Sequence, residues 1–246
     1  ILPSSDTAIY DAAGNSARRS QFNNTPSLYD QSEYSIFIDI YDTQHLILIN
    51  NEPKTIVSTT YTDVIGDITN LKSVTVSKDV KQIGSGAFNG ATSLAEVIFE
   101  ADSTLETIGT SAFQGATNLV TITIPASVTS IGVEAFKNAT NLTTVSFEDI
   151  SNSDLRKIDY GAFWGATALS SITIPKSVTE IYDSAFMNTT KLTEVIFDDI
   201  SNSQLEHIYG ATGNGPNNDY GDNVWNHTGA FRGSGLTSII IPASVQ

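Results

Sequence analysis

The sequence of 246 residues contains no cysteine, few basic residues and no long apolar run. Without cysteine, a disulfide framework, a zinc knuckle, a thiolate iron–sulfur site and a cysteine nucleophile are all excluded. The 27 acidic residues outnumber the 12 basic ones and give a formal net charge of −15. Such a chain offers no basic surface to nucleic acid or to an anionic membrane. No apolar run approaches the ~20 residues that span a bilayer, so we expect no membrane insertion.

Recognised catalytic signals are also missing. The sequence has no Gly-x-Ser-x-Gly, no Walker loop and no His-Glu-x-x-His. The three histidines, His45, His207 and His227, are scattered, and the glycines Gly210 to Gly215 follow no βα unit that would make them a phosphate cradle. We therefore predict that the protein is not an enzyme and that it needs no cofactor or resident metal.

An internal repeat dominates the chain. An Ala-Phe pair recurs six times, and the steps between successive phenylalanines are 25, 23, 27, 23 and 45 residues. A leucine follows each of the first five phenylalanines after six residues, and it opens a Leu-x-x-apolar-x-apolar pattern such as Leu119-Ile122-Ile124. This ending has period two and predicts a short strand with one face buried. The six phenylalanines are Phe88, Phe113, Phe136, Phe163, Phe186 and Phe231.

A unit of about 25 residues cannot bury its own apolar face, so we expect the units to stack into a solenoid. The predicted fold is an α/β-type, right-handed superhelix whose short strands form a parallel sheet on the concave face. The Ile-Gly-x-x-Ala-Phe segments have apolar residues about one helical turn apart, and they predict short helical or 3₁₀ turns on the convex face.

The ends and one insertion depart from the repeat. Residues 34–41 and 45–49 predict a β-hairpin, so we divide the chain into a tail and β-rich cap at 1–53 and a solenoid of about seven repeats at 54–246. Residues 54–76 resemble a degenerate first repeat, with Val64-Ile65 in place of Ala-Phe. The 45-residue step predicts an insertion within 209–228. Because the sequence stops inside a repeat, we expect this chain to be a piece of a longer protein.

The repeat resembles a known family. The segment 124–136, IPASVTSIGVEAF, and the segment 174–181, IPKSVTEI, followed by Ala185-Phe186, closely resemble the BspA-like (Treponema-type) leucine-rich repeats of bacteria and protists. Many members have cysteine three residues after the phenylalanine, where this chain has alanine or threonine. The resemblance implies a secreted or cell-surface protein that adheres to host proteins or extracellular matrix.

In the predicted strands, the residues that flank the fourth position of each pattern point away from the core. They form a field of serine and threonine with glutamate and isoleucine, and we predict that it binds a protein ligand. Trp164 is either an exposed anchor on the convex side or a packing residue. In the insertion, Tyr220 and Trp225 lie among glycine and asparagine, a composition typical of binding loops, and the segment is either such a loop or a tolerated surface insertion. The predicted concave-face residues are Glu96, Ile98, Thr121, Thr123, Thr144, Ser146, Ser171, Thr173, Glu194, Ile196, Ser238 and Ile240.

Three alternatives stay open. The repeats could be a structural spacer in a larger surface protein. Calcium could bind the oxygens of Asp198 and Asp199 or of Asp219 and Asp222, although neither set has EF-hand spacing. A threonine ladder could bind glycan or ice, but glutamate and isoleucine interrupt it.

Overall fold

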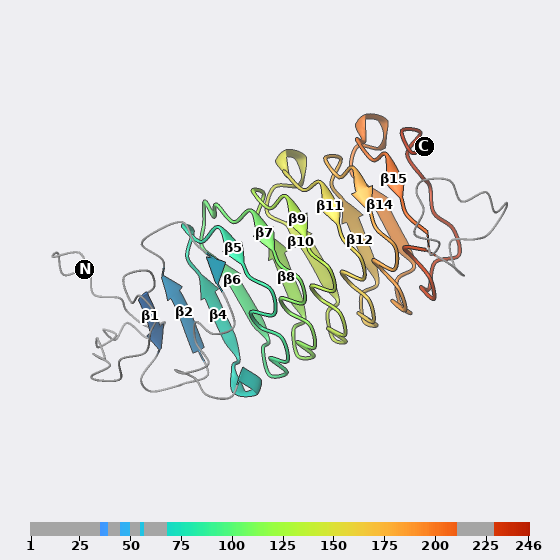
Figure 1. Ribbon diagram of the computed structural model, residues 1–246. Coiled ribbons are helices and arrows are strands. Elements are labelled where there is room, and N and C mark those ends of the chain that lie inside the picture. Colours follow the sequence, from blue (N-terminus) through green and yellow to red (C-terminus); the bar gives the residue numbers. More distant parts are fainter. Residues whose placement is uncertain (1–34, 39–44, 50–54, 57–67, 211–228) are drawn as a thin grey trace.

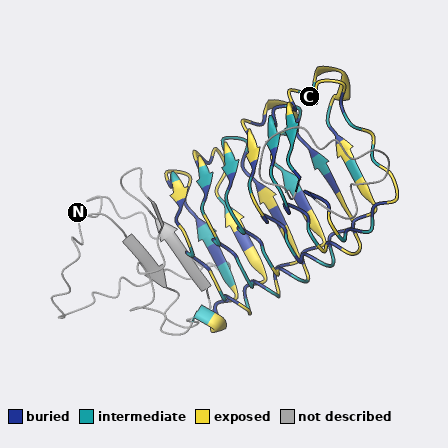
Figure 2. Cartoon of the chain, turned by 45° about the vertical axis from the view of Figure 1, so that its right-hand side comes forward, coloured by how far each residue is buried: buried dark blue, intermediate teal, exposed yellow. Residues whose placement is uncertain are grey.

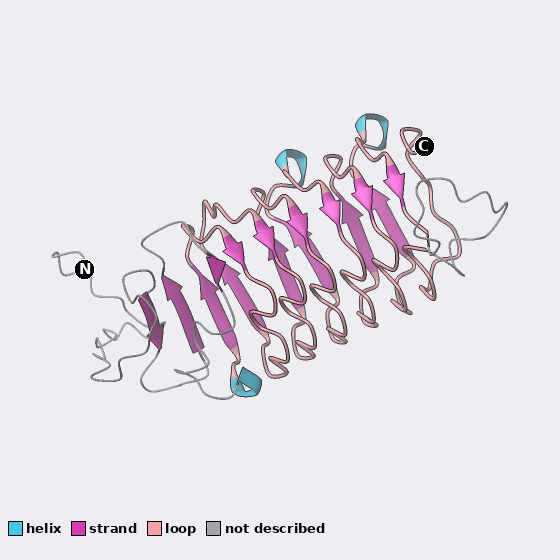
Figure 3. Cartoon of the chain, viewed as in Figure 1, coloured by secondary structure: helices cyan, strands magenta, loops and turns pink. Residues whose placement is uncertain are grey.

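The chain winds into an elongated stack of coils, and the regular coils each contribute one longer and one shorter strand (Figures 1 and 3). The computed structural model describes residues 68–210 and 229–246 in full, and for residues 35–38, 45–49 and 55–56 it gives the strand pairing. The two kinds of strand lie on opposite sides of the stack, and the buried side chains lie between them. The predicted parallel-strand solenoid is therefore confirmed.

The longer strands form one side of the stack, which we call the long-strand face. Hydrogen-bonded ladders run in the order β1-β2-β4-β6, β8-β10 and β12-β14, and all pairs are parallel except β1 with β2. The antiparallel β1–β2 pair confirms the predicted hairpin strands. The bounds are β1 Ser35–Ile38, β2 His45–Ile49, β4 Ser73–Val76, β6 Glu96–Phe99, β8 Thr121–Ile124, β10 Thr144–Phe147, β12 Ser171–Ile174 and β14 Glu194–Phe197.

The opposite side, the short-strand face, is a single seven-stranded parallel sheet in the order β15-β13-β11-β9-β7-β5-β3. Each strand has two residues, and in β5 to β13 the second one is a fully buried isoleucine such as Ile131. The bounds are β3 Thr55–Ile56, β5 Gln82–Ile83, β7 Thr107–Ile108, β9 Ser130–Ile131, β11 Lys157–Ile158, β13 Glu180–Ile181 and β15 His207–Ile208.

This sheet corrects the expectation of helical turns at the Ile-Gly-x-x-Ala-Phe segments. The isoleucine belongs to a strand, and the Ala-Phe pair lies in separate turns, in which Ala135 N–H donates to the carbonyl of Gly132 at 3.2 Å. The 3₁₀ helices of the described residues lie in other connections, at η1 Ile68–Asn70, η2 Ile150–Asn152 and η3 Ile200–Asn202.

Two physical features prevent a helix at the Ala-Phe pair. The phenylalanine N–H donates across coils to the alanine carbonyl of the next coil, as in Phe136 to Ala162 at 2.7 Å, so it cannot close a helical turn. Each coil also places two residues in the left-handed region, where helices do not run. In the central coil they are Glu134 and Asn138, with φ of 54° and 59°. Glycine or asparagine, which tolerate this region, fills the second place in every described coil.

A column of phenylalanines forms the centre of the core. The six repeated rings are all fully buried, with neighbouring centroids 5.1–5.3 Å apart and planes within 3–13° of parallel. Buried leucine, isoleucine and valine residues of both faces belong to the same core cluster as the column, and Figure 2 shows buried segments on the strands. Since each ring contacts only its neighbours, the coils depend on one another for burial.

The 45-residue step keeps the stack in register. Phe231 stacks on Phe186 at 5.2 Å, and Phe186 N–H donates to the carbonyl of Ala230 at 2.6 Å. These are the contacts that phenylalanines one coil apart make elsewhere, so Phe186 and Phe231 lie in consecutive coils, and the predicted insertion within 209–228 falls in the step between them. The insertion itself lies outside the described residues.

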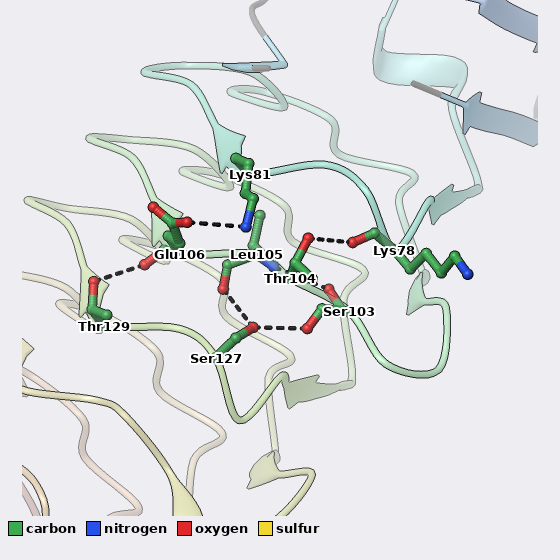
Figure 4. Close-up of polar contacts among 8 residues, drawn as sticks. All are labelled: Lys78, Lys81, Ser103, Thr104, Leu105, Glu106, Ser127 and Thr129. Atoms are coloured by element: carbon green, nitrogen blue, oxygen red, sulfur yellow. Dashed lines mark hydrogen bonds and ion pairs between the residues drawn. The ribbon is translucent and has the colours of Figure 1, made fainter. Parts of the chain in front are cut away.

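Hydroxyl groups tie adjacent coils together beside the short-strand face (Figure 4). Ser127 Oγ donates to the carbonyls of Ser103 at 2.9 Å and Leu105 at 2.7 Å. Thr104 and Thr129 donate in the same way to carbonyls of the preceding coil, at 2.7 and 2.9 Å. The carbonyls of Lys78 and Glu106 also accept the backbone N–H of the same threonines, so these hydroxyls add a second bond between the coils at each acceptor.

The two ends of the stack differ from the expected repeats. Residues 236–241 keep the Leu-x-x-Ile-x-Ile pattern, but they form no strand, which corrects the prediction of a last strand there. The spacing from Phe231 to Leu236 is one residue shorter than in the other coils, and Gly235 packs too closely on the carbonyl of Thr190 to carry a side chain. At the other end, β2 pairs with β4 and β3 with β5. Val64-Ile65 lies outside the described residues, and the division at residue 53 stays a prediction.

Candidate protein-binding surface

The long-strand face exposes every second side chain of its strands. In β8, Thr121 and Thr123 are exposed, whereas Ile122 and Ile124 are buried. The cause is the period-two geometry of a strand whose apolar residues pack on the phenylalanine column. The alternation in the sequence therefore decides which side chains a partner can reach.

All twelve residues predicted on this face lie at its surface. Ser146 and Thr173 are half-buried. The other ten are exposed, and they are Glu96, Ile98, Thr121, Thr123, Thr144, Ser171, Glu194, Ile196, Ser238 and Ile240. Ser238 and Ile240 lie on the irregular last segment rather than on a strand. That these residues form a binding site stays a prediction.

The middle of the face, over β8, β10 and β12, is a layer of small hydroxyl side chains. Thr123 and Ser146 hydrogen bond to each other at 3.0 Å across β8 and β10, and Ser146 also donates weakly to the carbonyl of Ile122 at 3.4 Å. Because serine and threonine are short, a partner can approach the backbone closely here. Each hydroxyl can both donate and accept hydrogen bonds.

The two strands on either side of this hydroxyl layer, β6 and β14, carry a different pair of outward residues. In both β6 and β14 the sequence is Glu-Val-Ile-Phe, with the glutamate and the isoleucine facing outward. Ile98 is 41% exposed and Ile196 is 45% exposed. The face thus has a neutral hydroxyl centre between two identical acidic and apolar strands.

Val120 is a surface residue that the sequence reasoning missed. It is 45% exposed and comes immediately before β8. The reasoning considered only the residues that flank the fourth position of each pattern, whereas Val120 directly follows the leucine. In the other complete coils the residue after this leucine is alanine, threonine or serine. The larger apolar side chain of Val120 at this position was the signal in the sequence that could have identified it.

The short-strand face carries a cluster of charged and aromatic side chains near the C-terminal coils. Lys157 Nζ lies 2.9 Å from Glu180 Oε2, and the hydroxyls of Tyr182 and Tyr209 each donate to this carboxylate at 3.2 Å. The two tyrosine rings stack with centroids 4.7 Å apart. These contacts join three successive coils, β11, β13 and β15, and we call the four residues the tyrosine clamp.

Hydrogen bonding within the clamp shifts its titrations. The bond from Lys157 lowers the pKa of Glu180 below its ordinary value of 4.5, and the bonds to Glu180 and Tyr182 raise the pKa of Lys157. Burial, followed by the bond to Glu180, raises the pKa of Tyr209. Each shift favours the protonation state that keeps the cluster hydrogen bonded.

Trp164, left open by the sequence, is half-buried in the turn after β11. Lys137 Nζ lies 4.1 Å from the centre of its ring and also pairs with Glu134 at 2.7 Å, while Tyr160 meets the ring edge-on at 6.5 Å. A cation over the indole and an edge-on phenol are favourable packing contacts. The structure therefore uses Trp164 to pack neighbouring turns.

Other candidate sites have limited structural support. Tyr220, Trp225, Asp219 and Asp222 lie outside the described residues. Asp199 Oδ2 accepts a hydrogen bond from Asn202 Nδ2 at 2.9 Å. Within the described ranges, no three histidine or acidic side chains come together as metal ligands would. Nor does any helix in those ranges have the length and apolar character needed to traverse a bilayer.

Comparison with known families identifies the repeat. Residues 62–193 and 148–246 match the BspA type leucine rich repeat region, with six copies. This match covers well over half of the chain, so the protein belongs to the BspA-type leucine-rich repeat family. A comparison with curated proteins gives no match.

Solved structures share the fold. The pneumococcal vaccine antigen PcpA has a TM-score of 0.53 at 23% identity, over 74% of this chain and 52% of that one. The T. pallidum leucine-rich repeat protein TpLRR has a TM-score of 0.52 at 20% identity, over 72% and 90%. A leucine-rich repeat protein from Bacteroides ovatus has a TM-score of 0.50 at 21% identity, over 89% and 60%. The chain thus spans little more than half of PcpA and of the Bacteroides protein.

Proposed function

We propose that this chain is a non-catalytic, extracellular or cell-surface binding module that adheres to host or matrix proteins through its long-strand face. The observation that carries the proposal is the exposure of that face. Ten of its twelve predicted side chains are exposed. Membership of the BspA-type family supports a role in protein interaction and an extracellular location.

The size of the face determines the expected strength of binding. The part of the face that carries ten of the predicted residues consists of the five four-residue strands β6, β8, β10, β12 and β14, which cover roughly 24 by 13 Å, or about 300 Å². A stable protein interface buries about 800 Å² on each partner and relies on aromatic or arginine anchors. The outward residues of these strands include neither. We therefore expect weak single contacts that become strong when many copies act together on a surface.

An adhesion assay with multivalent beads tests this proposal. Beads coated with the 246-residue chain are passed over films of collagen, laminin and total plasma protein, and retention is compared with uncoated beads. Thr144→Arg places a large side chain in the centre of the long-strand face and should reduce retention several-fold. Thr110→Arg makes the same change in charge and size on an exposed turn outside that face and should leave retention unchanged. Equal retention of the two variants, or no retention of the parent chain, would contradict the proposal.

A spacer role is the second candidate. It is favoured by the partial span of this chain relative to the pneumococcal and Bacteroides proteins and by a stack in which each coil contacts only its neighbours. In that case beads with the isolated chain retain nothing, whereas beads with a longer natural protein that contains it adhere. The same assay therefore separates the two functions.

A further inference from the structure

Two strands of the long-strand face repeat the same outward pair of residues. β6 and β14 both read Glu-Val-Ile-Phe, and both expose the first and third side chains. Outward residues two positions apart on a strand are separated by about 6.7 Å. Glu96 with Ile98, and Glu194 with Ile196, therefore form two equivalent Glu–Ile sites, each with a carboxylate beside an apolar side chain.

The carboxylates of these two sites are unpaired in the described part of the chain. Glu96 and Glu194 take part in no ion pair or side-chain hydrogen bond there, although Lys191 lies only three residues before Glu194. Glu96 and Glu194 are the acidic residues among the outward positions of β6, β8, β10, β12 and β14, whereas Glu106 and Glu180, beside the short-strand face, pair with Lys81 and Lys157. The acidic groups available to a partner on the long-strand face are thus concentrated at its two flanks.

A lysine or arginine side chain matches each Glu–Ile site. Its methylene stem covers apolar surface while its charged end reaches out to a polar group. A stem laid on Ile98 or Ile196 brings the cation to the neighbouring carboxylate, about one side-chain length away. The net charge of −15 also favours the approach of a basic partner.

The spacing of the two sites defines the partner further. β8, β10 and β12 lie between β6 and β14, so the sites are four strand spacings apart, or roughly 20 Å at ~4.8 Å each (Figure 1). An extended chain covers this distance in about six residues, at ~3.3 Å per residue. Residues an even number of positions apart point to the same side of an extended segment. Two cations at positions i and i+6 would therefore both face the sheet.

The surface between the sites suits an extended backbone. The outward residues of β8, β10 and β12 are serine or threonine only, so a segment that crosses these strands meets no side chain larger than threonine on them; the exposed Val120 lies just before β8. Their hydroxyls can bond to peptide N–H and C=O groups along the way.

We infer that the long-strand face binds an extended basic segment of a partner protein, with two lysine or arginine residues six positions apart seated in the two Glu–Ile sites. This inference rests on the proposed function, because it names the partner chemistry for the same face. It makes recognition bivalent, so that spacing as well as charge decides affinity.

Peptide binding to the full 246-residue chain tests the inference. The probes are capped, fluorescent 11-residue Gly/Ser peptides that carry two arginines six apart, two arginines three apart, or one arginine. Anisotropy titrations at low salt should give tightest binding for the six-residue spacing, by about fivefold over either other peptide. Glu96→Gln or Glu194→Gln should remove this advantage, and the double variant should weaken binding about tenfold.

The control variant is Glu206→Gln, which makes the same charge change at an exposed residue next to β15 on the other face. It should leave all three affinities unchanged, and circular dichroism should show the same fold for every variant. Equal binding of the two-arginine peptides, or equal loss with Glu206→Gln, would overturn the inference in favour of diffuse attraction by net charge. The bead assay above is independent of these peptides, so retention that is insensitive to the Glu96 and Glu194 changes would leave the proposed function standing without the inference.

Discussion

The two faces of the solenoid use their outward side chains in different ways. On the long-strand face, Glu194 and Ser171 project from the sheet without a side-chain partner among the described residues. On the short-strand face, Glu180 is held by a lysine and two tyrosines from neighbouring coils. The backbone shows the same contrast, because the short-strand sheet is continuous over seven strands whereas the long-strand ladders are interrupted.

The contacts that hold the coils together and the side chains that are available to a partner thus lie on different faces. Side-chain and backbone bonds beside the short-strand face hold successive coils together, so outward residues of the long-strand face without a cross-coil bond, such as Thr121 and Ser171, can vary with little loss of stability. A solenoid can in this way change its ligand while it keeps its stack. Changes on the two faces should therefore have different consequences, which the following substitutions measure.

The largest effect is expected in the core that both faces share. Phe136→Ala removes the third ring of the column, which is fully buried between Phe113 and Phe163. The cavity should lower the free energy of unfolding by about 3–5 kcal/mol. Urea denaturation monitored by circular dichroism measures this change. Thr121→Ala on the long-strand face is the control and should stay within about 0.5 kcal/mol; a loss of similar size in both variants would remove the distinction between core and face.

The second-largest effect on the free energy of unfolding is expected for a serine beside the short-strand face, compared with a serine on the long-strand face. Ser127→Ala deletes a hydroxyl that donates to Ser103 and Leu105 of the preceding coil and should cost about 1–2 kcal/mol, because it leaves half-buried carbonyls without this donor. Ser171→Ala makes the same change at an exposed position of β12 and should cost less than about 0.5 kcal/mol. The two urea midpoints are compared directly. Equal losses would show that the hydroxyl bonds beside the short-strand face contribute nothing to cohesion.

The smallest effect is a pH dependence on one face only. Hydrogen bonding from Lys157 lowers the pKa of Glu180, so its contribution is present above the ordinary value of 4.5 and is lost as the pH falls through the lower folded value. Because the pair is partly exposed, the contribution should be at most about 1 kcal/mol. Glu180→Gln should flatten the fall in stability below pH 4.5. Glu194→Gln, with no partner among the described residues, should leave the slope as in the parent chain. Urea unfolding at a series of pH values measures both slopes. If Glu194→Gln flattened the fall in stability and Glu180→Gln did not, the stabilising role of the tyrosine clamp would be contradicted.

Much of the fold could be predicted from the repeat alone. The Ala-Phe spacing located each coil, and period two in Leu-x-x-apolar-x-apolar placed Ile122 inside and Thr123 outside. The same spacing predicted an insertion within 209–228, and Phe231 continues the column after it. The prediction failed where the neighbouring coil decides the structure. The Ile-Gly-x-x-Ala-Phe segment has helix-like apolar spacing, but the N–H of its phenylalanine bonds to the next coil. Residues 236–241 keep the strand pattern without forming a strand.

What the sequence determines by itself is the identity of each position in the coil, because side-chain burial follows from local periodicity and from a unit too small to fold alone. It therefore determined the family, the core and the twelve outward residues. Only the tertiary structure decided which acidic groups are already paired and how far apart the free ones lie. Glu180 and Glu194 look alike in sequence, yet one sits in the tyrosine clamp and the other does not, because pairing depends on the residues that stacking brings alongside from other coils.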